Sequence, residues 1–399
     1  MSNKKNIVCV SNTTWEGFYT KSTVQLVSLL AKSNNLLFVE YPFTIKDLIF
    51  TLMGKGRAPV ARMLGLKSRL VKKNSTFNTE VNHLVLPPLL PFAFFKNEKL
   101  YQFFLNLNSF FYARSIKRAL RKLNMTKPVS VNAYNAIYGN ALLNKIGEKL
   151  NIYYCYDGPD VRRYGDRAIV SDHSFAENVD GVITTSDFLA ESMNHLNPQT
   201  KVVKNGVDFQ VFNKSAKSSL RGAVKKKVGY IGSLDHRFDL ETVEYTIQQL
   251  ADYEFEFVGD LMNKKIHEVL AHYPNVTFLP PVKPHEVPDL LKDCDVGLIP
   301  YLCTEYTKNI YPLKINEYLS VGVPVVLTSF AHLPEFDGVA NFTTTKEAFC
   351  EAIKSEIESD TEAKIKERIE YAKGTSWESR AVDFEKIIDG FLIESNKNN

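Results

Sequence analysis

The sequence predicts an α/β protein with two doubly wound domains, and three observations lead to this prediction. The chain has 399 residues, more than a single hydrophobic core usually serves, so two domains are the default expectation. In both halves short apolar runs alternate with amphipathic stretches, which is typical of mostly parallel sheets covered by helices. A segment rich in Ser and Lys, residues 213–227, separates the halves and is interpreted as a linker. We therefore expect an N-terminal domain at 1–212 and a C-terminal domain at 228–376.

The N-terminal half starts with a strand, a polar loop, a helix and a second strand. The first apolar run covers residues 6–10, an amphipathic stretch ends at Lys32, and the next apolar run covers 36–41. Short apolar runs bounded by turn residues are typical of buried strands. The same pattern predicts three more strands, at 129–132, 152–156 and 181–185, and a helix at 141–150.

The C-terminal half alternates more clearly. Its expected strands cover residues 228–231, 255–258, 276–279, 296–299 and 323–327. In doubly wound sheets a ligand binds outside the carboxyl ends of the strands. This places four segments around one crevice, namely 232–237, Gly259, 281–283 and 301–314. Residues 346–394 are expected to be helical, and the last segment, 377–399, is long enough to return to the N-terminal domain.

Residues 311–326, YPLKINEYLSVGVPVV, are the most informative stretch of the chain. A helix is expected to begin at Pro312 or at the next residue, since Pro suits the first helical position, and to end at Gly322. Lys314 then lies in the first turn, where the helix dipole disfavours a cation by roughly 0.3 to 1 kcal/mol. A phosphate bound there would reverse this penalty, because it can take both the backbone amides and the lysine charge. Glu317 could accept hydrogen bonds from sugar hydroxyls; an exposed ion pair between Glu317 and Lys314 is the alternative.

Composition excludes several classes of protein. The net charge of +4, from 49 basic and 45 acidic residues, is too small to indicate nucleic-acid binding. The five cysteines show no CxxC spacing, which fits reduced thiols in the cytoplasm. The N-terminal apolar run is too short for a signal peptide. A dehydrogenase is disfavoured because the first strand is followed by SNTTWEG rather than GxGxxG.

Several motifs occur in a characteristic order along nearly the whole chain. They are WEG at 15–17, YDGPD at 156–160, VITTS at 182–186, VVKNGVD at 202–208, GYIGSLDHRFD at 229–239, NVTFLPPVKPHEVPDLL at 275–291 and DCDVGLIPY at 293–301. Together with the helix motif above, they resemble GT-B glycosyltransferases of the retaining family 4 type, in particular bacterial cell-surface polysaccharide enzymes akin to the teichuronic acid type. The resemblance implies two Rossmann-like domains facing across a cleft, with the helix 377–399 packing back on the N-terminal domain.

The resemblance also implies a donor site held mainly by the C-terminal domain. Glu317 would contact the nucleotide ribose, the amides near Leu313 to Ile315 would hold the diphosphate, and Lys314 would neutralise its charge. Asn309 stands where many relatives have a Glu that contacts the transferred sugar, and Ser233 stands where many have an Arg. The full donor-binding set is Gly17, Gly232, Ser233, Arg237, Val282, Asn309, Leu313, Lys314, Ile315 and Glu317.

Three residues are assigned catalytic roles: Asp157, Lys314 and Arg237. Arg237 would take over the phosphate role of the missing Arg, with an ordinary surface Arg as the alternative and His236 as a weaker candidate. Asp157 matches an acceptor-side polar residue of the family, although an Asp before Gly158 can equally serve a turn. Asp160 and His173 are lesser candidates.

The DxD string at Asp293 and Asp295 is a metal signature of a different glycosyltransferase fold. Asp295 begins a buried strand, so we expect no metal and no cofactor besides the donor. The resemblance thus implies a metal-independent, retaining glycosyltransferase of the hexosyltransferase type. It would move a sugar from a nucleotide-diphosphate sugar to a saccharide or lipid-linked saccharide acceptor. A sugar-nucleotide 2-epimerase of the same fold and a non-catalytic sugar-nucleotide binding protein are the alternatives.

Residues 84–122 are unusually aromatic and end in a basic stretch, 114–122. Neither apolar run in this segment is long enough to span a bilayer. Six side chains fall on one helical face, namely Leu100, Phe103, Phe104, Leu107, Phe110 and Phe111. One interpretation is an interfacial helix that gives peripheral contact with an anionic membrane, at the inner face of the cell membrane. The alternative is a core helix with a solvated basic end.

Overall fold

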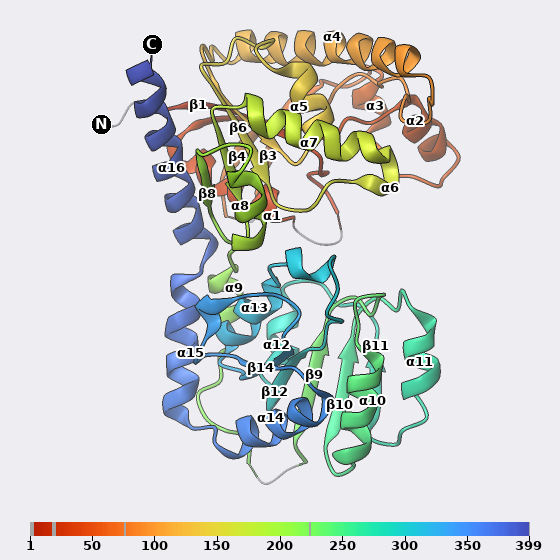
Figure 1. Ribbon diagram of the computed structural model, residues 1–399, viewed down its shortest axis with the longest axis vertical. Helices are drawn as coiled ribbons and strands as arrows, with labels where there is room; N and C mark the ends of the chain where they lie inside the picture. Colours follow the sequence, from red (N-terminus) through yellow and green to blue (C-terminus); the bar gives the residue numbers. More distant parts are fainter. Residues whose placement is uncertain (1–3, 18–20, 76, 223–224, 399) are drawn as a thin grey trace. The chain divides into compact units, whose positions relative to one another are not determined.

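The protein folds into two compact units (Figure 1), seen in a computed structural model that describes residues 4–17, 21–75, 77–222 and 225–398. The first unit comprises Met1–Lys204 and Ala381–Asn399, and the second comprises Asn205–Arg380. Residues 223 and 224 of the expected linker lie outside the described residues. Each unit contains its own sheet.

The sheet of the first unit has eight strands in the order β3-β4-β2-β1-β5-β6-β7-β8. Neighbouring strands are parallel except β3 and β4, which pair antiparallel at one edge. The order reverses at β1, which lies between β2 and β5. The strands are β1 (Asn6–Ser11), β2 (Asn35–Val39), β3 (Leu70–Asn74), β4 (Glu80–Leu84), β5 (Val129–Ala133), β6 (Leu150–Cys155), β7 (Gly181–Thr184) and β8 (Thr200–Val202).

Helices cover both faces of this sheet. They are α1 (Ser22–Ser33), α2 (Ile45–Leu52), α3 (Val60–Met63), α4 (Glu98–Lys122), α5 (Ala136–Leu142), α6 (Val161–Tyr164), α7 (Asp166–Asn178) and α8 (Asp187–Asn194). The prediction of a helix at 141–150 is wrong. The helix ends at Leu142, because Asn144 and Gly147 adopt positive φ angles of 60° and 81° that an α-helix cannot contain. Residue 150 already belongs to β6.

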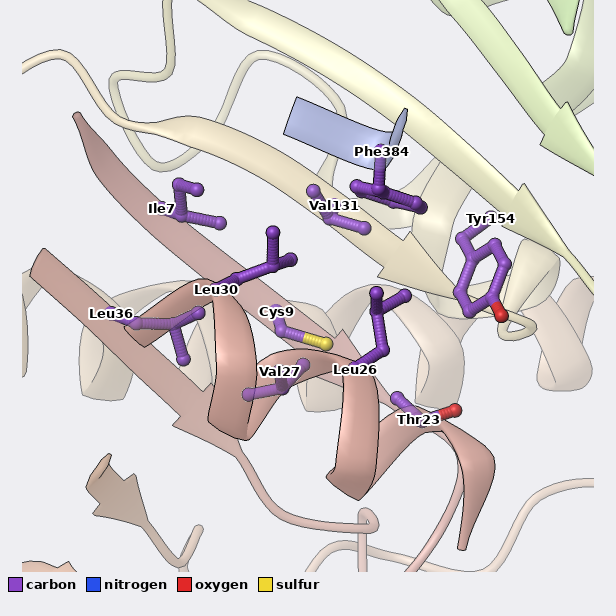
Figure 2. A pocket seen from close by; sticks show the side chains of 10 residues that line it. All are labelled: Ile7, Cys9, Thr23, Leu26, Val27, Leu30, Leu36, Val131, Tyr154 and Phe384. Carbon is purple, nitrogen blue, oxygen red and sulfur yellow. The ribbon is translucent and has the colours of Figure 1, made fainter. Parts of the chain in front are cut away.

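The last helix, α16 (Trp377–Asn398), begins in the second unit and contributes its residues from Ala381 onward to the first. Figure 2 shows Phe384 of this helix converging with side chains of α1 and β1 on an apolar cavity, whose volume is only about 10 Å³. The Phe384 ring meets the Tyr154 ring edge-on at 5.4 Å. Further along, a β-carbon on Gly181 would lie 2.5 Å from the Phe391 ring, so a glycine is needed there. These contacts make α16 part of the first core.

The second unit has a six-stranded, wholly parallel sheet in the order β11-β10-β9-β12-β13-β14. Its strands are β9 (Lys227–Ile231), β10 (Glu254–Val258), β11 (Val276–Leu279), β12 (Val296–Ile299), β13 (Val325–Thr328) and β14 (Asn341–Thr343). Its helices are α9 (Phe209–Asn213), α10 (Leu240–Gln249), α11 (Lys264–Leu270), α12 (Val287–Leu291), α13 (Leu313–Val321), α14 (Lys346–Glu358) and α15 (Glu362–Gly374), with short 3-10 turns η1 (Thr307–Asn309) and η2 (Pro334–Phe336). The order reverses at β9, between β10 and β12.

The described part of the expected linker, 213–227, lies within the second unit. Lys217 is buried, and its Nζ donates a hydrogen bond of 2.9 Å to the carbonyl of Cys294. Phe212, just before this segment, belongs to the core of the unit. Because these side chains are fixed by tertiary contacts, the segment does not behave as a free connection, and the second unit begins at Asn205 instead.

Candidate functional site

The candidate site lies where the sheet order of the second unit reverses. In doubly wound sheets a ligand binds outside the carboxyl ends of the strands, at the point where the strand order reverses. Gly232 follows β9, Tyr301 follows β12 after one proline, and α13 begins at Leu313. Gly232 has a φ of 153°, and a β-carbon added there would overlap Cε of Lys314 and lie 2.6 Å from its Nζ. The lysine side chain therefore lies directly over the glycine.

Lys314 occupies the first turn of α13, as predicted. Pro312 is the N-cap residue and provides no side-chain cap, and Gly322 ends the helix in the left-handed conformation with a φ of 87°. The Nζ of Lys314 donates a hydrogen bond of 3.1 Å to the hydroxyl of Tyr301 and lies 5.6 Å from the Tyr230 ring centroid. A cation is thus held beside uncapped helix amides, an arrangement that favours an anion.

A second cation, Arg237, faces the same tyrosine. Its Nε donates a hydrogen bond of 2.9 Å to Asp235, and its guanidinium lies over the Tyr301 ring at 5.2 Å. The hydrogen bond that Arg237 donates to Asp235 raises the pKa of Arg237 above its ordinary range. This guanidinium is therefore oriented by two neighbours, unlike a free surface arginine.

The pKa of Tyr301 is lowered by these two cations. Its phenol is buried, and burial raises the pKa, but Lys314 and Arg237 outweigh this effect and hold the pKa below the ordinary value of 10.0. Positive potential at this point lowers the free energy of any anion that enters the crevice.

Glu317 lies one turn further along α13 and is half-buried. Burial raises the pKa of its carboxyl, and Lys314 opposes the shift. Among the described residues, no hydrogen-bond donor contacts its carboxylate. A half-buried acceptor of this kind can take hydrogen bonds from ligand hydroxyls.

The other predicted donor-site residues of this unit make contacts of their own. The carbonyl of Ser233 accepts a hydrogen bond of 2.8 Å from the Tyr230 hydroxyl, and Ile315 is buried in the core. Val282 packs against that core from the loop after β11. The amide of Asn309 donates to the carbonyl of Glu305 at 2.8 Å. The structure thus brings Lys314 and Arg237 to Tyr301, with Lys314 over Gly232, while Asn309 bonds within its own loop and Val282 packs against the core.

Gly17 and Asp157 belong to the first unit, at the carboxyl ends of β1 and β6. Before Gly17, the amide of Trp15 donates to Glu40 at 3.0 Å, and Glu40 in turn pairs with the buried His83 at 2.6 Å. The carboxylate of Asp157 accepts a hydrogen bond of 2.9 Å from the Gly158 amide, which is a turn contact.

The two lesser candidates also lie in this unit. Asp160 caps α6 through the Arg163 amide, and His173 is exposed on α7.

The DxD string lies at the amino end of β12, away from the carboxyl ends where the candidate site lies. Asp295 precedes β12 and accepts hydrogen bonds from the Lys227 amide at 2.7 Å and from Arg221 at 2.8 Å. Across the part of the chain that the structure describes, no group of three or more His, Cys, Asp or Glu side chains has the geometry of a metal site.

Sequence reasoning missed the roles of Tyr301 and Asp235. A signal for Tyr301 was its position directly after the apolar run and Pro300, at the carboxyl end of a central strand. The signal for Asp235 was its position two residues before Arg237 on a short loop. A carboxylate at that distance can bind the guanidinium and orient it.

Residues 225–359 match the protein family described as Glycosyl transferases group 1. Over 163 residues the chain is 31% identical to the putative teichuronic acid biosynthesis glycosyltransferase TuaH of Bacillus subtilis (strain 168), and the match covers 38% of this chain and 41% of the relative. The chain therefore spans about two fifths of the length of this curated relative.

Solved structures resemble nearly the whole chain. Sucrose-phosphate synthase from Thermosynechococcus elongatus is 15% identical, with a TM-score of 0.69, over 98% of this chain and 100% of its own. Anabaena HepE in complex with UDP and glucose is 14% identical, with a TM-score of 0.64, over 96% of this chain and 99% of its own. At these identities the likeness concerns the fold, which is the GT-B fold with two parallel-sheet domains.

Proposed function

We propose that this chain, whose residues 225–359 form a Glycosyl transferases group 1 domain, transfers a sugar from a nucleotide-diphosphate sugar to a saccharide or lipid-linked saccharide acceptor. The observation that carries the proposal is the pair of cations in the second unit, Lys314 and Arg237, which flank Tyr301 beside the uncapped start of α13. This pair lies within the matched domain. A diphosphate is the ligand whose charge and size suit it.

The proposed chemistry follows from that charge. When the bond between the sugar and the diphosphate breaks, negative charge develops on the leaving oxygen, and stabilising this charge is the main task of the catalyst. Lys314, Arg237 and the first amides of α13 would supply the stabilisation, so the proposal invokes no divalent ion. We also propose retention at the anomeric carbon, on the resemblance stated above.

Three residues would make the remaining contacts with the donor. Glu317 would accept hydrogen bonds from the ribose hydroxyls, Asn309 would turn toward the transferred sugar, and Val282 would lie beside the base. The solved structure of HepE with UDP and glucose supports a uridine nucleotide as the first to test.

The acceptor belongs to the first unit in this proposal. Asp157 lies at the carboxyl end of β6, where ligands of doubly wound sheets bind, while Gly17 stays with the donor-binding residues. We also propose a role in bacterial surface polysaccharide synthesis, which the name of the Bacillus subtilis relative, a putative teichuronic acid biosynthesis glycosyltransferase, supports. Asp157 would be the catalytic polar residue on the acceptor side and would face the transferred sugar.

Calorimetric titration of the full chain with UDP, GDP and ADP tests the donor half of this proposal. Lys314→Met should weaken binding of the preferred diphosphate by roughly 10- to 150-fold, the equivalent of about 1.5 to 3 kcal/mol for a charge-assisted hydrogen bond. Lys346→Met is the matched control, since Lys346 also stands in the first turn of a helix of this unit but pairs with Glu241 on the surface. Equal affinities for Lys314→Met and the unmodified chain would refute the site.

Product analysis tests the transfer itself. The unmodified chain, given the preferred nucleotide sugar, should release free nucleotide diphosphate, faster when saccharide acceptors are added. Conversion of the donor sugar to its epimer without any release would instead identify an epimerase. Binding with no turnover under all conditions would identify a non-catalytic protein.

A further inference from the structure

Helix α4 buries one face and exposes another that is apolar in its first half. Tyr101, Leu105, Tyr112 and Ile116 belong to the core of the first unit. The predicted row lies on the other side, and the exposed fractions of Phe103 and Phe110 are both 60%. Four of the six side chains of this row are exposed, whereas Phe104 packs against the core and Leu107 is half-buried.

Two half-buried rings, Phe95 and Phe104, connect the exposed rings of Phe94 and Phe103. Ring centroids of Phe94 and Phe95 lie 4.4 Å apart, those of Phe95 and Phe104 4.9 Å, and those of Phe103 and Phe104 5.3 Å. We call these four rings the aromatic patch. Exposed apolar surface of this kind marks an interaction site.

The second half of the same face is basic. Phe103, Phe110, Arg114, Lys117 and Arg121 follow one another at steps of seven, four, three and four residues, so they share one side of the helix. No Asp or Glu occurs from residue 99 to residue 147. The face is thus apolar at one end and uninterruptedly positive at the other.

Beside the basic half lies a groove of about 860 Å³, between the end of α4 and the loop before β3. Five basic side chains line it, and none of the described lining residues is acidic; the five are Lys67, Arg69, Arg118, Arg121 and Lys122. Leu66, which also lines it, is 77% exposed. We call this the basic groove. It offers several phosphate groups a place beside an exposed leucine.

We propose that the aromatic patch and the basic groove together bind the surface of an anionic phospholipid bilayer. Lipid phosphates would enter the groove, and the phenylalanine rings would insert at the boundary between headgroups and acyl chains. Figure 1 shows α4 lying along the edge of the first unit, and no described helix of the chain is long and apolar enough to cross a membrane. The helix would therefore lie on the bilayer.

Charge selects this occupant over a second copy of the chain. A symmetric dimer through this face would set each basic half against either the basic or the aromatic half of the other copy, and neither arrangement neutralises the cations. An anionic bilayer neutralises all of these cations at once. The proposal stands apart from the glycosyl-transfer proposal, because it concerns neither the crevice of the second unit nor its ligand.

Flotation of the full chain with vesicles of equal parts phosphatidylglycerol and phosphatidylcholine tests the proposal. The chain should float with these vesicles at about 0.01 M salt and be released at about 1 M, as the Debye length falls from roughly 30 to 3 Å. Vesicles of phosphatidylcholine alone should bind little. Absence of flotation with phosphatidylglycerol at low salt would overturn the proposal.

Two double variants locate the contact. Phe103→Ser with Phe110→Ser should reduce the bound fraction through the apolar half, and Arg118→Glu with Arg121→Glu should reduce binding by at least about tenfold through the basic half. Lys264→Glu with Lys265→Glu, an exposed pair on α11, carries the same charge change as a control and should float normally. All three should keep the nucleotide affinity and thermal midpoint of the unmodified chain.

Two outcomes of this comparison would also refute the proposal. One is equal flotation of all variants. The other is a dimer by light scattering that the phenylalanine variants dissociate, since it would make this face a contact between copies.

Discussion

The side chain of Lys314 fills the space over Gly232 that the β-carbon of any other residue would need, and the two positions are 82 residues apart in the chain (314 − 232). The close approach keeps the ammonium at the carboxyl end of β9, within 3.1 Å of the Tyr301 hydroxyl. Donor binding should therefore depend on the size of residue 232 as much as on the charge of residue 314.

Gly232→Ala should displace Lys314 and lower the affinity for the nucleotide diphosphate by roughly tenfold, because one charge-assisted contact is lost. The positive φ at this position adds backbone strain. Gly338→Ala separates the two effects, since Gly338 has a φ of 81° but nothing within 4 Å of an added β-carbon. Calorimetry should show reduced affinity for the first variant only, and an equal loss in both would mean that strain alone is responsible.

Tyr301→Phe should weaken diphosphate binding by a few-fold while leaving the fold unchanged. The variant removes the hydroxyl that accepts the hydrogen bond from Lys314 but keeps the ring beneath Arg237. The ammonium itself stays, so the loss should be smaller than the roughly 1.5 to 3 kcal/mol of the charge-assisted contact that Lys314→Met removes. Tyr301→Leu, which also removes the ring, should lose more. Unaltered affinity in Tyr301→Phe would show that the hydroxyl does not position the lysine.

The affinity for the nucleotide should fall as the pH is lowered through the raised pKa of Glu317. Burial raises the pKa of Glu317 above 4.5, so its carboxylate gains a proton earlier than usual and ceases to accept two hydrogen bonds from the ribose. The same raised pKa means that the unliganded fold gains stability from Glu317 at low pH and loses it as the pH rises through this value.

Glu317→Gln is the matched variant for this experiment. It should bind the nucleotide more weakly at neutral pH and with an affinity that no longer changes with this titration. Calorimetry across the acidic range, with a nucleoside in place of the diphosphate to remove phosphate titration, measures both effects. A pH profile identical in the two proteins would exclude Glu317 as the titrating group.

Arg368→Ala should destabilise the second unit by about 3 to 5 kcal/mol, the usual cost of breaking a buried ion pair. Arg368 donates to Asp360 at 2.6 Å and to the carbonyl of Gly322, at the end of α13, at 3.0 Å. Lys373→Ala on the same helix removes only a surface pair with Glu370 and should cost about 1 kcal/mol or less. Urea denaturation compares them; restoring stability by adding Asp360→Leu to Arg368→Ala would confirm that the unpaired carboxylate carries the cost.

Local sequence patterns predicted those strands and helix ends that depend only on residues close together in the chain. The strands at 276–279 and 296–299 agree with β11 and β12 to the residue, because each is a short apolar run between turn residues. The end of α13 at Gly322 was predicted for a similar reason, since its left-handed conformation suits glycine.

Prediction failed where longer-range contacts decide the outcome. Apolar residues at 141–150 suggested a helix, but Asn144 and Gly147 turn the chain into β6. The edge pair of β3 and β4 is a hairpin in which Asn74 pairs with Glu80; it was not predicted, because β3 is only partly buried and ends in polar residues. The segment 213–227 has the composition of a linker, yet Lys217 is buried through its bond to Cys294.

By itself the sequence determined the alternation of strands and helices, the placement of Lys314 and Glu317 on one helix, and the crevice expected at the carboxyl ends of the second sheet. These features depend on periodicity and on turn residues that act within a few positions. Only the tertiary structure decided that Lys314 lies over Gly232, that Tyr301 stands between Lys314 and Arg237, and that α4 exposes its phenylalanines. The physical reason is the same for all three: parallel strands and their covering helices bring together residues that are distant in the chain, and packing selects which face of each element is buried.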